Sequence, residues 1–191
     1  MSLLSVVGKL TRGLRAGEER LIRHRSEFEG LPISIQLTSA AFPDGGAIAR
    51  KYTVAGEDIS PPLAWINLPS GTRDLALVVE DYDISLSTPM VHLIAYHLEP
   101  ISGGIEEGAL PSRDSTGLLS TVQLGKNGLS HFRYDGPAPP PGHGTHHYVF
   151  QLFALGRRLE IAPNSGKDIL IYGMKEHVLS LGVLTGTFER M

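Results

Sequence analysis

Carboxylate and imidazole side chains interrupt the most apolar stretches of this sequence, and groups of these types can hold an anion or a metal ion. Asp81 and Asp83 follow the apolar run 75–79, and His92 lies inside the apolar run 91–96. On an extended chain, residues two positions apart point to the same side, so the two carboxylates share one face. Each feature also has a structural interpretation. The aspartates suit a solvated turn after a strand, and a lone histidine among apolar residues is typical of a hydrogen-bonded core position.

A stiff loop precedes a further pair of polar side chains. Residues 136–144 include four prolines, which hold the backbone near polyproline II and reduce the entropy lost when a ligand binds. Gly136 and Gly142 flank the prolines and allow the backbone to approach a ligand closely. His146 and Tyr148 follow at the start of a predicted strand and share a face. We interpret the loop as a wall of a binding site, although a ligand for SH3 or WW domains has a similar composition.

The elements that position these residues are expected to be mostly strands. Apolar or alternating segments bounded by turn residues predict strands at 33–37, 75–79, 91–96, 148–155 and 183–187. Helical spacing is found in residues 168–181, with Leu170, Met174, Val178 and Leu181 on one side and Gly182 as the stop. The expected fold class is therefore mainly β, with helices at the margins.

Composition narrows the class of protein. The 191 residues are 41% hydrophobic and 19% charged, carry a net charge of −3, and include no cysteine. The absence of cysteine excludes disulfides, thiolate metal sites and cysteine nucleophiles, and the negative net charge gives no reason to expect nucleic acid as a partner. No apolar run approaches the roughly 20 residues that cross a bilayer. We therefore expect a cytoplasmic protein with no integral membrane segment.

Residues 1–30 differ in charge from the rest of the chain. They hold six Lys or Arg against four Glu, and apolar residues recur from Leu3 to Leu21 at alternating steps of four and three. This spacing predicts an amphipathic helix, so we divide the chain into an N-terminal helical extension over 1–30 and a domain over 31–191. The apolar stripe is expected to pack on the chain's own domain or across a homodimer. A membrane-surface or targeting helix is the alternative.

Together these motifs resemble the phosphatidylethanolamine-binding protein (PEBP) family, and most closely its bacterial and archaeal Raf-kinase-inhibitor-like branch. Residues 56–65 are similar to the family's G-x-x-I-S-P-P-L-x-W element, and residues 81–83 resemble its D-P-D element. Residues 136–148 resemble G-P-x-P-P-x-G-x-H-R-Y, and residues 177–188 resemble the family's last helix and strand.

The resemblance implies a PEBP-like antiparallel β-sandwich of Greek-key type and a non-catalytic function. That function is the binding of small phosphate-bearing anions, such as phospholipid head groups or nucleotides, with modulation of a kinase or a protease and with no cofactor or metal. Matched position by position, the ligand-binding residues would be Asp81, Asp83, His92, Gly136, Pro139, His146 and Tyr148. Imidazoles and a phenol can donate hydrogen bonds to phosphate oxygens, and a carboxylate can fix the imidazole tautomer.

Several positions depart from the family pattern, including residues 84–89 and Met90, and two of them lie within the matched motifs. Tyr82 stands where the family has proline, and His147 stands where it has arginine. The second change replaces a permanent cation by a titratable one, and it bears on the identity and affinity of the ligand.

Two catalytic functions are alternatives. A metal-dependent hydrolase could use His92, His146 and Asp81 as ligands, with His143 beside them, although the sequence lacks an H-E-x-x-H motif. A serine hydrolase could use Ser85 or Ser87, although the sequence lacks G-x-S-x-G.

Overall fold

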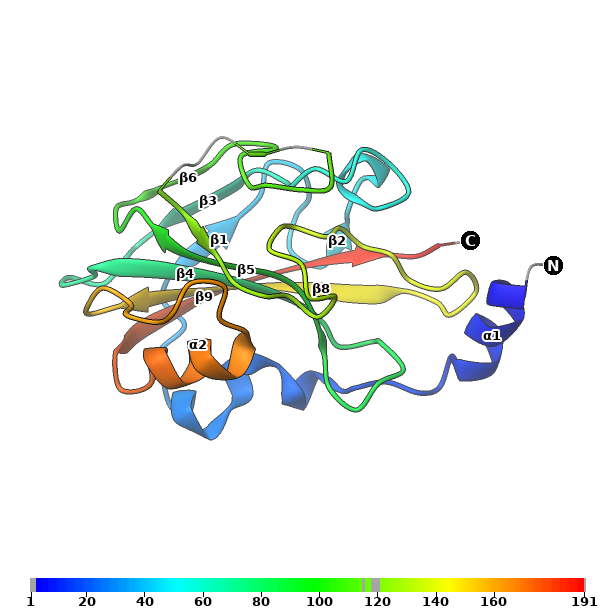
Figure 1. Ribbon diagram of the computed structural model, residues 1–191, viewed down its shortest axis with the longest axis horizontal. Coiled ribbons are helices and arrows are strands. Elements are labelled where there is room, and N and C mark those ends of the chain that lie inside the picture. Colours follow the sequence, from blue (N-terminus) through cyan, green and yellow to red (C-terminus); the bar gives the residue numbers. More distant parts are fainter. Residues whose placement is uncertain (1–2, 115, 118–120, 191) are drawn as a thin grey trace.

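Two stacked β-sheets form the centre of the computed structural model, which describes residues 3–114, 116–117 and 121–190 (Figure 1). The strands of the larger sheet are β2 (Gly46–Ala47), β4 (Asp74–Asp81), β5 (Met90–Leu98), β7 (Gln123–Leu124), β8 (His146–Leu155) and β9 (Val178–Phe188). The smaller sheet contains β1 (Gln36–Thr38), β3 (Leu63–Ile66) and β6 (Gly103–Ile105). The spatial orders are β2-β9-β8-β4-β5-β7 and β1-β3-β6, and every pairing except β2 with β9 is antiparallel. The predicted mainly β class is confirmed.

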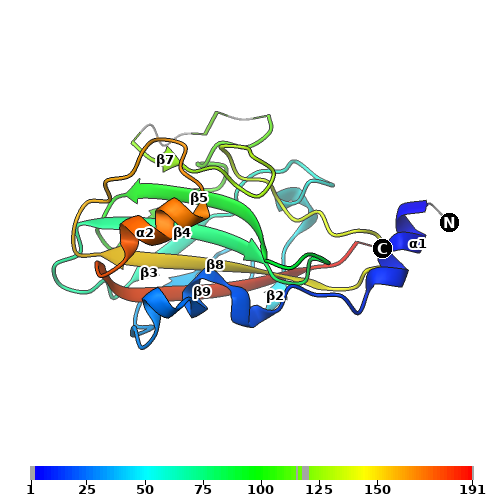
Figure 2. The same cartoon turned by 60° about the horizontal axis from the view of Figure 1, so that its bottom comes forward.

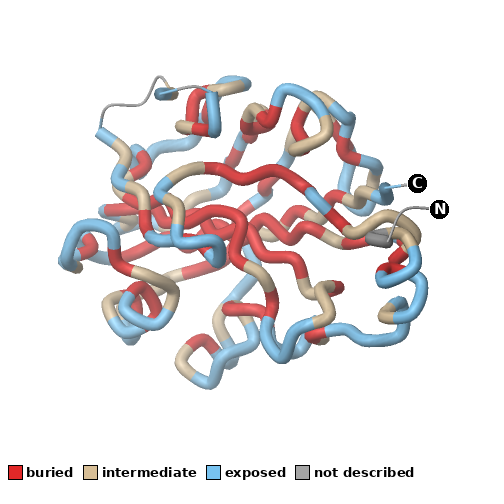
Figure 3. Tube along the Cα trace, turned by 45° about the vertical axis from the view of Figure 1, so that its right-hand side comes forward, coloured by how far each residue is buried: buried red, intermediate tan, exposed pale blue. Residues whose placement is uncertain are grey.

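The central strands are covered on both faces, which explains their uninterrupted apolar sequences. All residues of β4 are buried, and Figure 3 shows the buried trace concentrated in these strands. One apolar cluster lies between the sheets and includes Trp65 and Phe150, while the other includes Phe153 and Leu170 of helix α2 (Lys167–Met174). The strands predicted at 75–79, 91–96 and 148–155 are confirmed.

The strand predicted at 33–37 is only partly correct. Ile33 forms an isolated bridge with Leu181, and β1 begins at Gln36. The alternation of Ile33, Ile35 and Leu37 still has a physical cause, because Ile35 and Leu37 are buried while Ile33 is exposed.

The helix predicted over 168–181 is wrong after its first half. Helix α2 ends at Met174, and Glu176, with φ of 65°, turns the chain into β9. Gly182, expected to stop the helix, lies within β9 opposite Leu152. The apolar spacing suited both structures locally, and pairing with β8 along ten residues decides between them. The strand expected at 183–187 is confirmed as the second part of β9.

The single N-terminal helix predicted up to Leu21 is also wrong. Helix α1 (Leu3–Thr11) is followed by an irregular segment and by short 3-10 turns at 18–20, 22–24 and 26–28. Gly17, with φ of 98°, adopts a conformation that a continuing helix forbids. Figure 2 shows α1 beyond one end of the larger sheet and the segment that follows α1 running alongside β9.

The predicted apolar stripe is consequently divided between two environments. Leu21 and Ile22 are fully buried, whereas Val7, Leu10 and Leu14 are exposed. Val7, Leu10 and Leu14 therefore do not pack on the chain's own domain, and packing across a homodimer stays a prediction; the side chain of Leu3 lies outside the described part. None of the helices in the described part of the chain is long and apolar enough to cross a membrane.

Candidate functional site

The candidate site lies where β4 ends and β5 and β8 begin. Asp81, the last residue of β4, is paired with Tyr148 of β8, and His146 is two positions before Tyr148. Residues two apart on a strand share a face, so the polar end of β4 meets the polar start of β8 on the side of the sheet that also buries Val79 and Phe150.

A β-bulge brings His92 to this same face. Val79 is paired with Leu93, and the next residue, Glu80, is paired with Val91, so His92 is the additional residue on β5. A bulge of this kind re-aims the side chain of the extra residue. The His92 ring accordingly contacts the Tyr148 ring edge-to-face, with 5.1 Å between centroids.

A backbone carbonyl fixes the orientation of the His92 ring. Its Nδ1 lies 2.7 Å from the carbonyl oxygen of Asp135, and only 7% of the residue is exposed. A carbonyl can only accept, so Nδ1 carries the proton and Nε2 is the atom left for other partners.

Asp135 is itself fixed by a polar cluster. Its carboxylate accepts hydrogen bonds from Asn127 Nδ2 at 2.7 Å, His131 Nδ1 at 2.8 Å and Arg133 Nε at 2.9 Å. Burial alone would raise the pKa of Asp135, but these three donors together lower it. The cluster therefore keeps the carboxylate charged and fixes the backbone carbonyl that orients His92.

A chain of hydrogen bonds runs from Asp81 to the surface through two histidines. Asp81 Oδ2 lies 2.7 Å from His146 Nδ1, His146 Nε2 lies 2.7 Å from His143 Nδ1, and His143 Nε2 lies 2.8 Å from Ser85 Oγ. Both histidines are fully buried. Because a carboxylate only accepts, the neutral chain has one consistent direction, in which Ser85 donates to His143, His143 to His146, and His146 to Asp81.

Burial and the neighbouring His146 lower the pKa of His143. His143 therefore prefers the neutral form in the folded protein. When His143 is protonated, its Nδ1 still donates to His146 and its Nε2 donates to the carbonyl oxygen of Thr11, 3.0 Å away.

Tyr148 supplies a buried hydroxyl to the same place. The residue is 1% exposed, and among the described residues its hydroxyl makes no hydrogen bond of good geometry. Burial raises the pKa of the phenol well above its ordinary value, and the charge of Asp81 adds to this, while the backbone N–H of Ala138 acts in the opposite direction. A buried, unpartnered polar atom costs free energy of folding, and its presence is typical of a functional site.

Asp83 is saturated by partners from two directions. Its Oδ1 accepts from Arg15 at 2.5 Å, and its Oδ2 accepts from the backbone N–H and Nδ1 of His147 at 2.6 and 2.8 Å. Asp83 thus joins the N-terminal segment to β8. Both of its carboxylate oxygens already accept hydrogen bonds within the protein.

The side chains of Tyr82 and His147, the two departures within the matched motifs, contact each other. The rings of Tyr82 and His147 stack with 5.2 Å between centroids and an interplanar angle of 6°. Burial and the nearby Asp83 raise the pKa of Tyr82 to about 12. A proline at position 82 could not make this stack, and Arg15 of the N-terminal segment forms an ion pair with the neighbouring Asp83.

Gly136 and Pro139 form part of the loop beside the site. Gly136 donates its backbone N–H to Asp58 Oδ1 at 2.8 Å, and a β-carbon at this position would lie 2.4 Å from the carbonyl oxygen of Tyr52. Pro139 is buried. Gly136 is therefore needed for close packing of the loop, and its N–H is already used.

The sequence prediction missed several contributors. Ser85 and His143 appeared only in the catalytic alternatives, and Asp135 and Arg15 were not considered. Ser85, Asp135 and Arg15 contact partners that are 58, 43 and 68 residues away in the chain, so no local spacing reveals these contacts. His143 is different, because its partner His146 is three positions away.

The proposed metal ligands do not form a metal site. Within the described ranges, no group of three or more His, Cys, Asp or Glu side chains has the arrangement needed to hold a metal ion. The second ring nitrogen of His146 is bonded to His143, which leaves the set of His92, His146 and Asp81 without convergent lone pairs.

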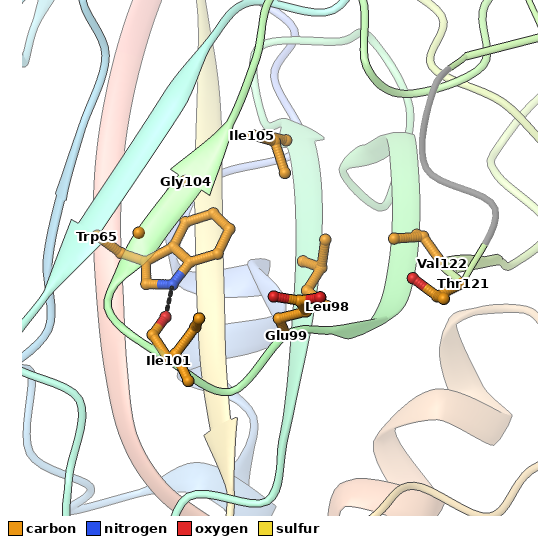
Figure 4. A pocket seen from close by; sticks show the side chains of 9 residues that line it. Trp65, Leu98, Glu99, Ile101, Gly104, Ile105, Thr121 and Val122 are labelled. Atoms are coloured by element: carbon orange, nitrogen blue, oxygen red, sulfur yellow. Dashed lines mark hydrogen bonds between the residues drawn. The ribbon is translucent and has the colours of Figure 1, made fainter.

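A separate cavity of about 270 Å³ lies at the opposite end of the sheet (Figure 4). The Trp65 indole donates to the carbonyl oxygen of Ile101 at its edge, at 2.8 Å. Other residues that line this cavity include Leu98, Glu99, Ile105 and Val122. It contains no residue of the candidate site.

Comparison with known proteins identifies the class. The family model described as phosphatidylethanolamine-binding protein matches residues 38–189. The chain is 35% identical over 152 residues to a UPF0098 protein of Pyrococcus horikoshii, covering 80% of this chain and 75% of that protein. The crystal structure of a putative PEBP homologue from Chlamydia trachomatis has a TM-score of 0.74 and 31% identity, covering 83% and 99% of the two chains. The chain therefore belongs to the phosphatidylethanolamine-binding protein family.

Two further matches bear on fold and location. The structure of Escherichia coli YbcL has a TM-score of 0.75 at 24% identity, covering 83% of this chain and 99% of that one, and supports the fold alone. A Mycobacterium tuberculosis relative, 33% identical over 155 residues and covering 81% and 72% of the two chains, is named a putative lipoprotein. A cytoplasmic location for this chain accordingly stays a prediction.

Proposed function

We propose that this protein binds small phosphate-bearing anions, such as phospholipid head groups or nucleotides, without transforming them. The observation that carries the proposal is the gathering of His92, His146 and the unpartnered hydroxyl of Tyr148 on one buried face. Family membership supports a binding role in general. The partner class that the resemblance implies, a kinase or protease, belongs to this proposal and is tested once ligand binding is established.

The hydrogen bonds behind the two imidazoles decide how they would bind an anion. Both use Nδ1–H for a fixed protein acceptor, Asp135 in one case and Asp81 in the other. In the neutral rings Nε2 then carries a lone pair, which in His92 repels an anionic oxygen and in His146 accepts from His143 Nδ1. His92 can donate to an anion from Nε2 only when the ring is protonated, and His146 only when it is protonated and released from His143, so binding of a phosphodiester takes up protons.

Tyr148 contributes a neutral donor. Because its pKa is raised by burial, the phenol keeps its proton throughout the neutral pH range. It can donate to a phosphate oxygen without a change of charge, and this contact would satisfy the atom that the protein itself leaves without a partner.

The Ser85–His143–His146–Asp81 chain resembles the arrangement of a serine hydrolase, but its surroundings favour binding over catalysis. Ser85 Oγ lies 3.4 Å from the carbonyl oxygen of Thr11 and 3.2 Å from that of Leu14. Carbonyl oxygens repel a developing oxyanion, whereas an acyl-transfer site needs N–H donors at that position.

The test is calorimetric titration with sn-glycero-3-phosphoethanolamine, a phosphodiester whose own charge is constant between pH 6 and 8, and with AMP as the nucleotide. His92→Ala and His146→Gln should each weaken binding by roughly 1–3 kcal/mol, the scale of a lost charge-assisted hydrogen bond. His24→Ala, at an exposed position away from the site, is the matched control. Affinity that is indifferent to both site substitutions would contradict the proposal.

A further inference from the structure

The N-terminal segment, residues 5–17, lies across the candidate site and ahead of the range matched by the family model. We propose that this segment is a removable cap, which excludes ligands from His146 while docked and must lift for an anion to bind. The inference rests on the proposed anion-binding function and names how access to that site is controlled.

The cap reaches the innermost polar chain of the site. The carbonyl oxygen of Thr11 lies 3.0 Å from His143 Nε2 and 3.4 Å from Ser85 Oγ, and the carbonyl oxygen of Leu14 lies 3.2 Å from Ser85 Oγ. A carbonyl oxygen that faces an imidazole nitrogen occupies the position that an anionic oxygen of a ligand would take. Thr11 is thus an internal substitute for the ligand at the outer end of the chain.

Further contacts hold the segment to the loop that follows β4. Arg15 pairs with Asp83 and donates to the carbonyl oxygen of Thr145 at 3.2 Å. The backbone N–H groups of Ala16 and Gly17 donate to the carbonyl oxygens of residues 84 and 82 at 2.9 and 3.1 Å. These contacts hold the segment against Ser85 and His143.

Gly8 allows helix α1 to lie directly on the proline loop. A β-carbon at Gly8 would come within 2.4 Å of the carbonyl oxygen of Pro141 and 3.2 Å of the backbone nitrogen of His143. Both neighbours are backbone atoms, so neither can move aside by a change of rotamer. Only glycine permits this depth of docking, and any side chain must push the helix away from His143.

Polar contacts, and not buried apolar side chains, hold the cap in place. The side chains that α1 and the following residues turn away from the body are apolar, with Val6, Val7, Leu10 and Leu14 between 41% and 79% exposed. The face against the body holds Gly8 and Thr11. Little apolar surface is buried by docking, and segments of this kind open at low free-energy cost.

Large apolar side chains become buried only beyond the cap. Leu21 and Ile22 are fully buried, and the backbone N–H of Ile22 donates to the buried carboxylate of Glu80 at 2.8 Å. Gly13, with no atom within 4 Å of a β-carbon position, and Gly17, with its positive φ, lie in the last part of the cap, ahead of this anchor. The segment can therefore lift about these glycines while the anchor keeps it attached.

The test compares Gly8→Ala and Gly8→Leu with Gly13→Ala in the full-length chain. The first two place atoms against the Pro141 backbone and should displace the cap, while Gly13→Ala adds a β-carbon into open space and leaves the seat of the helix intact. None of the three alters a residue of the site. Two quantities are measured: the rate at which diethylpyrocarbonate modifies His143 and His146, mapped by mass spectrometry, and the affinity for sn-glycero-3-phosphoethanolamine.

The inference predicts faster modification of His143 and His146 in both Gly8 variants, with His24 unchanged as an internal reference, and an affinity raised about threefold or more as the open fraction increases. Modification at the wild-type rate in both Gly8 variants would overturn the cap. Faster modification with wild-type affinity would also overturn it and leave the proposed function standing. Absence of measurable binding in every protein, with the histidines accessible in the Gly8 variants, would overturn the proposed function and the inference with it.

Discussion

Asp81→Asn should destabilise the folded protein through the polarity of the hydrogen-bond chain, with almost no change in shape. Asp81 Oδ1 accepts from the backbone N–H of Asp83 at 2.8 Å, and Oδ2 accepts from His146 Nδ1 at 2.7 Å. Both partners are donors, and the carboxylate is 2% exposed. An asparagine offers one acceptor and one donor group, so one of the two original bonds cannot be kept.

The magnitude follows from the type of bond that is lost. Hydrogen bonds to charged groups contribute about 1.5–3 kcal/mol to the free energy of unfolding. For a domain of this size, that loss lowers the melting temperature by roughly 3–12 °C. The His146 ring is also expected to change tautomer, with Nε2 donating to His143, because Nδ1 would then face the asparagine NH₂.

Thermal unfolding at pH 7 and ¹⁵N-detected imidazole NMR measure the two effects. Glu160→Gln makes the same carboxylate-to-amide change at an exposed residue and should alter stability by less than about 0.5 kcal/mol. A melting temperature for Asp81→Asn equal to that of the control, with the His146 tautomer unchanged, would refute the direction assigned to the chain.

Three other substitutions test the framework around the site. Ile22→Ala should cost about 2–5 kcal/mol in chemical denaturation, since Ile22 is fully buried, whereas Leu10→Ala at an exposed position should change little. The lowered pKa of Asp135 adds stability that is present above the ordinary aspartate pKa and is lost as pH falls through the folded value, so Asp135→Asn should flatten urea stability in the acid range. The lowered pKa of His143 likewise adds stability above the ordinary imidazole pKa that is lost at lower pH, and His143→Gln should remove this slope between about pH 7 and 5.

The strands that carry the site were predictable because burial on both faces leaves a direct record in the sequence. The run at 75–79 is apolar throughout, the run at 148–155 is interrupted only by Gln151, and both lie in the middle of the larger sheet. The polar residues at their ends therefore had to meet at one edge once the strands were paired. The resemblance to the family predicted that Asp81, His146 and Tyr148 lie close together, and the pairing of β4 with β8 is the physical reason that they do.

The orientation of His92 depended on information that no local pattern contains. Alternation along β5 would place it on the face opposite Leu93, and the bulge reverses this. A bulge is a property of the register between two strands, so the sequence could propose His92 as a site residue but could not predict its orientation.

The N-terminal segment shows a different limit of sequence reasoning. Its apolar spacing predicts a helix with a buried stripe, but docking of Gly8 on the proline loop turns the apolar side outward. Periodicity reports which residues share a face. It does not report which face docks, and here the face with Gly8 lies against the backbone of the proline loop.

Anion binding by His92 and His146 is tested most directly by long-range ¹H–¹⁵N NMR of the histidine rings during titration with sn-glycero-3-phosphoethanolamine at pH 6 and pH 8. We predict that the Nε2 resonances of His92 and His146 move toward the imidazolium values as ligand is added, with tighter binding at pH 6, while the exposed His24 does not respond. Shifts confined to other histidines, or binding that leaves both rings neutral and is equal at the two pH values, would contradict the claim that these two imidazoles hold the anion.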